Sequence, residues 1–228
     1  MVKAMNKLDR LIKKLADEQH SDGSFGRFHT MNSKLKQRIP TTQAAAWLMY
    51  ENSLTRDNEI CHKTCLYMER LLNDLTLWPD AWEGNKWFKP AVPLFIASSL
   101  ALFGSEDKQY KEVCNIWINI LISAFETNEY SKEKINATSK TSFGVEIDGS
   151  YIGLHSLNSL ALYVFNTDSI PPDIQKSYLK WLHNYDGVIT YTNTRLDSLS
   201  TNAGSARVIS LLSRFIGYAD EFPNLIDS

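Results

Sequence analysis

The sequence has little excess charge of either sign. Its 228 residues carry 24 Lys and Arg against 26 Asp and Glu, a formal net charge of −2. Binding to nucleic acid or to an anionic membrane surface usually depends on a large basic excess. We therefore expect no nucleic-acid partner, and any charged site must be local.

Long apolar runs are also absent. The longest, Ala91–Phe103, is too short to span a bilayer and predicts a buried core helix. Near the N-terminus, Lys or Arg at positions 3, 7, 10, 13 and 14 interrupt the apolar run that a secretion signal requires. The sequence thus predicts no membrane span and a cytoplasmic location.

Cysteine is scarce. The three thiols, Cys61, Cys65 and Cys114, are odd in number, which argues against a disulfide framework and favours a reducing compartment. Cys61 and Cys65 are one helical turn apart, but His62 points about 100° away around that helix. We therefore interpret them as core thiols and expect neither a metal site nor a cofactor.

Linkers rich in Pro, Gly or Ser are missing, so we predict one domain over residues 1–228. With 43% hydrophobic residues, the chain can bury a substantial core. Helical periodicity dominates, and no long run alternates as a half-buried strand does. The predicted fold class is all-α.

Two kinds of helix alternate along the chain. Helices with one apolar face are predicted at 1–15, 57–75, 110–125 and 171–185. Helices that are apolar or small-residue on nearly every side are predicted at 42–50, 91–103, 152–165 and 203–215. Because a helix of the second kind must be covered on both faces, we predict two layers built from about four helical hairpins. The long loops then lie at one end, where the inner helices begin.

A helix that ends in a glycine-containing turn recurs, as expected of a helical array. In these turns the sequence resembles the prenyltransferase and squalene-cyclase repeat family, whose members form α/α toroids. The residues that carry the resemblance are Leu15, Gln19, Asp22, Gly23 and Phe25, then Tyr67, Leu71, Trp78 and Trp82, then Tyr178, Leu179, Trp181, Asp186 and Gly187. The resemblance implies that Gln19 braces the first turn and that the aromatic residue stacks against it.

The catalytic motifs of that family are missing. The chain has no Asp-x-Asp-Asp acid of the triterpene and class II diterpene cyclases, no Asp-x-Cys to begin the zinc set of protein prenyltransferases, and no Asp-rich magnesium motif. Four hairpins are fewer than the six usual for a closed toroid. We expect an open barrel or one that a partner chain completes, and whether the protein is an enzyme stays open.

The first long loop, residues 26–42, contains four Lys or Arg, one His and no acidic residue. It leads into a helix N-terminus, where unpaired backbone N–H groups favour an anion. We predict a phosphate or carboxylate site there, with a solvated basic loop as the alternative. The predicted ligands are Arg27, His29, Lys36, Arg38 and Thr42.

The second loop, residues 78–90, places three tryptophans among charged residues, which suits a cleft for an apolar or cationic ligand. Asp80 or Glu83 could act as a general acid there, because burial raises the pKa of a carboxyl group. The predicted binding residues are Trp82, Asn85, Lys86 and Trp87. Alternatively, Trp78 and Trp82 are structural aromatics of the repeat.

A third loop adds Asp148 and His155 as catalytic candidates and Tyr151 as a binding candidate. If the array curves as the resemblance implies, the long loops face one mouth.

Three functions follow as hypotheses. The first is an enzyme-like toroid that binds or processes an isoprenoid-type ligand with an anionic head group. The second is a non-catalytic scaffold that binds a peptide or protein, as curved helical arrays do. The third is a carbohydrate-binding or glycan-cleaving toroid, which needs two carboxylates across the cleft.

Overall fold

The computed structural model describes residues 6–29, 40–80, 85–190, 192, 194–195 and 203–223. In this part of the chain the helices are α1 (Lys7–Glu18), α2 (Thr42–Glu51), α3 (Glu59–Asn73), α4 (Phe88–Ala101), α5 (Lys108–Ala124), α6 (Lys132–Phe143), α7 (Leu157–Val164), α8 (Pro172–His183), α9 (Ala203–Leu212) and α10 (Tyr218–Glu221). Two 3₁₀ turns, η1 (Leu75–Leu77) and η2 (Thr167–Ser169), and one antiparallel pair, β1 (Val188–Ile189) with β2 (Thr194–Arg195), complete it. The predicted all-α class is confirmed.

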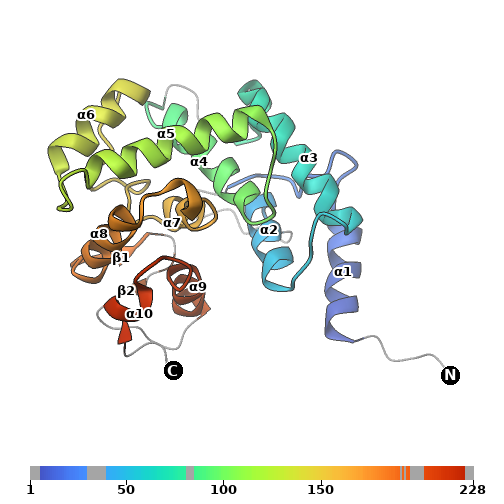
Figure 1. The fold of residues 1–228 in the computed structure, drawn as a ribbon. Helices are drawn as coiled ribbons and strands as arrows, with labels where there is room; N and C mark the ends of the chain where they lie inside the picture. The colour runs from blue at the N-terminus through green and yellow to red at the C-terminus, as the bar shows by residue number, and fades with distance from the viewer. Residues whose placement is uncertain are drawn as a thin grey trace.

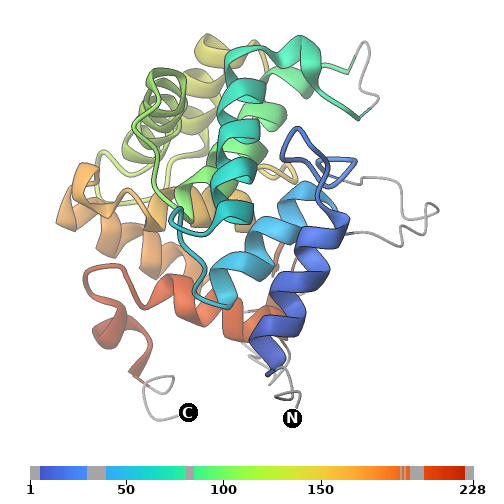
Figure 2. The same ribbon diagram turned by 90° about the vertical axis from the view of Figure 1, so that its right-hand side faces the viewer.

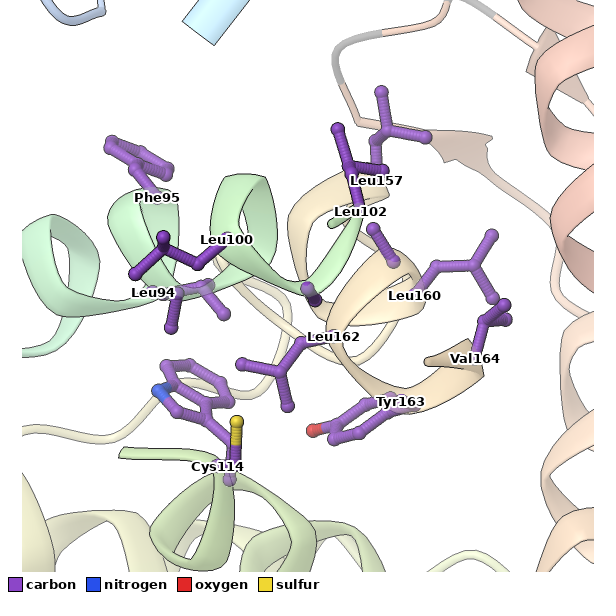
Figure 3. Close-up of a cluster of buried hydrophobic side chains, with 14 of the residues drawn as sticks. Leu94, Phe95, Leu100, Leu102, Cys114, Leu157, Leu160, Leu162, Tyr163 and Val164 are labelled. Atoms are coloured by element: carbon purple, nitrogen blue, oxygen red, sulfur yellow. The ribbon is translucent and has the colours of Figure 1, made fainter. Parts of the chain in front are cut away.

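Four helices form an inner row. Helix α2 contacts α4, α4 contacts α7, and α7 contacts α9. Every residue of α7 is buried, as are all residues of α4 from Leu94 to Ala101. Figure 3 shows the apolar contact between these two helices, with Leu162 of α7 pointing towards Cys114 of α5. The prediction of helices that are covered on all sides is correct for α7 and for the second half of α4. Helices α2 and α9 are only partly covered, since Ala44 on α2 and Ser210 on α9 are exposed.

The amphipathic helices cover this row from outside. Helix α1 contacts α3, α3 contacts α5, and α5 contacts both α4 and α7. In Figure 1, α5 runs across α4 and α7, and Figure 2 shows α1, α2 and α3 side by side. Helix α8 begins at Pro172, because proline suits the first turn of a helix. Each inner helix therefore follows an outer one along the chain.

Helix α6 was not predicted. It lies between the amphipathic helix α5 and the inner helix α7, and it packs on α5. Its apolar stripe is sparse, since only Ile135, Ser139 and Phe143 are buried. The predicted inner helix at 152–165 was also too long, because Ser156 caps α7 by accepting a hydrogen bond from the backbone N–H of Ser159 at 3.1 Å.

Gln19 braces the first turn, as predicted. The Nε2 of Gln19 donates to the carbonyl oxygens of Gly23 (3.2 Å) and Ile60 (2.9 Å) and to the Oγ1 of Thr64 (2.9 Å). Gly23 has a φ of +93°, and a Cβ there would lie 2.2 Å from the carbonyl oxygen of Lys63. This turn therefore requires glycine, and Gln19 ties α1 to α3.

The cysteines are core thiols, as predicted. Cys61, Cys65 and Cys114 are all buried and free. Burial raises the pKa of the Cys114 thiol to about 11, so this thiol stays protonated. No helix among the described residues combines the length and the apolar composition needed to cross a membrane.

Candidate functional site

A row of polar side chains joins the first turns of α2 and α7 to the last turn of α4 and to the first long loop. The Nδ1 of His29 lies 2.6 Å from the Oε1 of Gln43, at the start of α2. Gln43 donates through Nε2 to the Oδ1 of Asn158, at the start of α7, at 2.7 Å. Ser98, on α4, donates to the same oxygen at 3.0 Å. We call these four residues the polar row; it joins three inner helices and one loop.

The polar row sits in an otherwise apolar layer. Gln43, Ser98 and Asn158 are 7%, 2% and 3% exposed. Buried polar groups are costly unless they are hydrogen-bonded, and here each one has a partner inside the row. Because the Gln43 oxygen can only accept, the Nδ1 of His29 carries the proton. The His29 ring also lies on Phe95, with centroids 4.4 Å apart.

Asp80 joins the row from the second loop. Its Oδ2 accepts the backbone N–H of His29 at 2.8 Å, whereas its Oδ1 is buried without a hydrogen-bond partner among the described residues. Burial raises the pKa of the Asp80 carboxyl, against the opposing effects of the His29 N–H, the Arg27 charge and the backbone N–H of Phe28. Burial lowers the pKa of His29, partly offset by its bond to Gln43. These two pKa shifts favour a protonated, neutral Asp80 carboxyl and an unprotonated, neutral His29 imidazole.

Trp78 presents a second buried polar atom in the same loop. Its Nε1 has no hydrogen-bond partner among the described residues. The ring itself packs on Phe28, with centroids 5.0 Å apart. This contact supports the interpretation of Trp78 as a structural aromatic, but its unpaired donor lies only two residues before Asp80. A donor, the Nε1 of Trp78, and an acceptor, the Oδ1 of Asp80, therefore lie in one loop segment, and neither has a hydrogen-bond partner among the described residues.

A second group of predicted residues surrounds Trp87. Its ring meets Tyr151 edge to face at 5.7 Å, and the Nζ of Lys86 lies 5.3 Å from its centroid. A hollow of about 590 Å³ lies beside them, lined by Lys86, Trp87, Lys140, Gly144, Val145, Glu146, Asp148, Gly149 and Ser150. Asn85 instead has a structural role, since its Oδ1 accepts the backbone N–H of Trp87 at 2.9 Å.

Asp148 and His155 differ in how they are bound. Asp148 accepts a hydrogen bond from the hydroxyl of Tyr130 and pairs with Lys132 at 3.3 Å, so its carboxylate ties a loop to α6. His155 is 7% exposed and stacks on Tyr185 at 4.7 Å. Burial lowers the pKa of His155, with a smaller opposing effect from Asp148. Asp148 is therefore held by the segment at the start of α6, and His155 is a neutral base beside it.

Of the six remaining predicted site residues, the structure describes two, Thr42 and Arg27. Thr42 is fully buried and structural, because its Oγ1 accepts the backbone N–H of Phe25 at 3.0 Å. Arg27 is exposed, and its charge acts on Asp80. The other four lie outside the described residues: Lys36, Arg38, Trp82 and Glu83.

Gln43 and Ser98 were not predicted as site residues. A signal for them existed, because each is polar within a helix that is apolar or small-residue on nearly every side. Such residues must find partners in the interior. Their pairing with Asn158, 115 residues from Gln43 along the chain, could not be derived from local patterns.

No group of three or more His, Cys, Asp or Glu side chains in the described part of the chain is arranged to hold a metal ion. A scan against protein-family models found no matching family, and searches of curated proteins and of solved structures found no similar protein.

Proposed function

We propose that this chain is a terpenoid-cyclase-like or prenyltransferase-like α/α toroid that binds an isoprenoid-type ligand with an anionic head group, and that Asp80 donates a proton to that ligand. One observation carries the proposal: the Oδ1 of Asp80 is buried without a hydrogen-bond partner among the described residues. A buried polar atom in this state costs folding free energy. A ligand that forms a hydrogen bond with this oxygen offsets that cost.

The contacts of the inner helices support the toroid. They follow one another in chain order, and Arg207 on α9 reaches back to Glu51 on α2, with its Nη2 2.6 Å from the Oε1 of Glu51. A ring of four hairpins would then close within one chain. The three buried thiols support a reducing compartment such as the cytoplasm.

The proposed reaction is protonation of an alkene. The O–H bond of the Asp80 carboxyl breaks, and its proton adds to one carbon of a ligand double bond, leaving a carboxylate and a carbocation. The raised pKa keeps more of this carboxyl protonated near neutral pH than an exposed aspartate. The His29 N–H then stabilises the carboxylate. Loss of another proton, or addition of water followed by proton loss, gives a neutral product.

Positive charge for the head group is available nearby. Arg27 is exposed beside Asp80. Lys86 has no carboxylate partner among the described residues, and its contact is with the ring of Trp87. A diphosphate or carboxylate could pair with either cation, and a hydrocarbon tail suits the aromatic side chains of the same loops.

The test combines binding and turnover. Geranyl and farnesyl diphosphate are expected to raise the melting temperature, and pyrophosphate or farnesol alone should raise it less. Replacing Asp80 with Asn should preserve binding of farnesyl diphosphate and lower its turnover, followed by mass spectrometry of products, by roughly 10²-fold or more. Asp168→Asn is the control, because Asp168 is exposed on η2. No thermal shift with any prenyl compound, or full turnover in Asp80→Asn, would overturn the proposal.

The hollow beside Trp87 favours a second candidate, carbohydrate binding. Its wall combines the aromatic ring of Trp87 with the carboxylates of Glu146 and Asp148, a combination suited to a sugar ring and its hydroxyl groups. Titration with maltohexaose and cellohexaose tests it. Binding that is lost in Trp87→Ala but kept in Leu77→Ala, an exposed control, would support this candidate. No binding of either oligosaccharide would eliminate it.

A further inference from the structure

The two ends of the inner row do not close by close packing. Helices α2 and α9 flank a cavity of about 790 Å³, within the usual range of small-molecule sites, roughly 300 to 1,000 Å³. Its walls come from α2, from the turn of residues 53–55, from the end of α4 and from α9. We call it the seam cavity. It lies at the C-terminal end of α2. The polar row begins at Gln43, which is about 11 Å from Tyr50 along the axis of that helix.

The floor of the seam cavity is apolar. Trp47, Leu54, Leu102 and Leu211 line it, and each is less than 8% exposed. Ala206 and Ser210 line it from α9 with small side chains. An apolar floor under small wall residues leaves room for a flat hydrocarbon body.

The rim carries two arginines in different states. Arg207 is neutralised by Glu51, with its Nε 2.7 Å from the Oε1 of Glu51, and its guanidinium lies 4.5 Å from the centroid of Trp47. Arg214 has no carboxylate partner among the described residues. Its Nη2 donates to the hydroxyl of Tyr50 at 2.9 Å, and its guanidinium lies over the ring of Phe165 at 4.8 Å. Four of its five N–H groups make no hydrogen bond to the described residues.

The helix ends at this rim do not cancel that positive charge. The C-terminal carbonyls of a helix carry partial negative charge when they are unpaired. Here the side chain of Asn52 donates to the carbonyl of Leu48 at 2.8 Å, and that of Asn166 donates to Leu162 at 2.7 Å. Among the described residues that line the seam cavity, Arg214 is therefore the cation without a carboxylate partner.

We propose that the seam cavity binds a small aromatic carboxylate. Its carboxylate pairs with the planar fork of Arg214, and its ring lies over Leu54, Leu102 and Leu211. The neutral pair Arg207 and Glu51 borders the site and bridges α9 to α2. A ligand there fills the space between the first and last inner helices. This site is separate from the one at Asp80, and neither proposal depends on the other.

Calorimetric titration of the full chain with 1-naphthoate tests the proposal, with the neutral 1-naphthalenemethanol as matched ligand. The carboxylate is expected to bind at least about tenfold more tightly than the alcohol. Arg214→Gln should weaken naphthoate binding by a similar factor. Ser210→Trp, which fills the cavity from an exposed position on α9, should abolish it, whereas Ser213→Trp, exposed and outside the lining, should not. Saturating farnesyl diphosphate should leave the naphthoate Kd unchanged.

Each contrary result overturns the proposal. No heat with naphthoate up to about 1 mM means that the cavity does not take this class of ligand. Equal affinity for acid and alcohol, or an unchanged Kd in Arg214→Gln, removes the role of the guanidinium. Equal losses in Ser210→Trp and Ser213→Trp place the ligand elsewhere. Displacement by farnesyl diphosphate means that one site takes both compounds.

Discussion

The inner row contains two opposite kinds of helix contact. Where α4 meets α7, the side chains are mostly apolar, and nearly all are less than 2% exposed. Where α9 approaches α2, Arg207 and Arg214 bridge a cavity of about 790 Å³. Apolar burial contributes roughly 25 cal/mol per Å², whereas a partly exposed ion pair contributes about 0 to 1 kcal/mol. The contact between α4 and α7 therefore contributes much more to the stability of the fold. The approach of α9 to α2 contributes little and leaves a cavity between the two helices.

The polar row is intermediate between these two contacts. Three of its four side chains are buried, like those between α4 and α7, but the row is built from hydrogen bonds, as the bridges beside the seam cavity are. Its net contribution to stability is small even though breaking it is costly, since a buried group left unpaired keeps its full desolvation penalty. Four variants can separate these three regions.

The largest effect is expected at the apolar contact. Leu162→Ala removes a fully buried side chain that faces α5 and α4, and it should lower the free energy of unfolding by about 2 to 5 kcal/mol. Leu66→Ala on α3 is the control, because Leu66 is 49% exposed. Urea unfolding of both variants measures the difference. Equal losses would mean that the contact between α4 and α7 does not dominate stability.

The next largest loss of stability is expected in the polar row. Asn158→Leu leaves the Nε2 of Gln43 without its partner and should cost about 1 to 3 kcal/mol. Asn115→Leu provides the control, since Asn115 is exposed on α5. The double variant with Gln43→Leu should recover part of the loss, because both polar partners are then absent. A double variant that loses the sum of the single losses would show that the two side chains are not coupled.

These regions differ in how much of them the sequence predicts. The buried faces of α4 and of the second half of 152–165 followed from helices that are apolar all round. Helix α6 did not, because its three buried positions are too few to distinguish a helix from a polar loop. Apolar patterns repeat locally, so they can be interpreted without knowing which helix covers them.

The polar contacts depended on long-range geometry. Asp80 and His29 were both site candidates, but their meeting followed only from the curvature that the family resemblance implies. The sequence does not predict the seam cavity, because its lining comes from helix ends and short turns that carry no distinctive motif. Arginines in a helical pattern are usually solvated, and nothing in the sequence places Arg207 against Glu51.

The bridge beside the seam cavity should contribute less than either buried region. Replacing Arg207 with Met keeps much of the packing on Trp47 but removes the ion pair with Glu51. The expected loss is about 0.5 to 1 kcal/mol, because the two side chains are 30% and 38% exposed. A double-mutant cycle with Glu51→Gln measures the coupling. A coupling above about 2 kcal/mol would mean that this ion pair stabilises the fold about as much as a buried apolar contact does.

The smallest effect is on how the free energy of unfolding depends on pH. Burial lowers the pKa of His29 below its usual 6.5, so the native state binds fewer protons than the unfolded state. The stability that comes from a neutral His29 is present above about pH 6.5 and is lost as the pH falls through the lowered value. His29→Gln should therefore flatten the fall in unfolding free energy between about pH 7 and pH 5, whereas His62→Gln, exposed on α3, should not. If both variants follow the wild-type curve, protonation of His29 does not oppose folding, and the polar row accepts a charged imidazole at no cost.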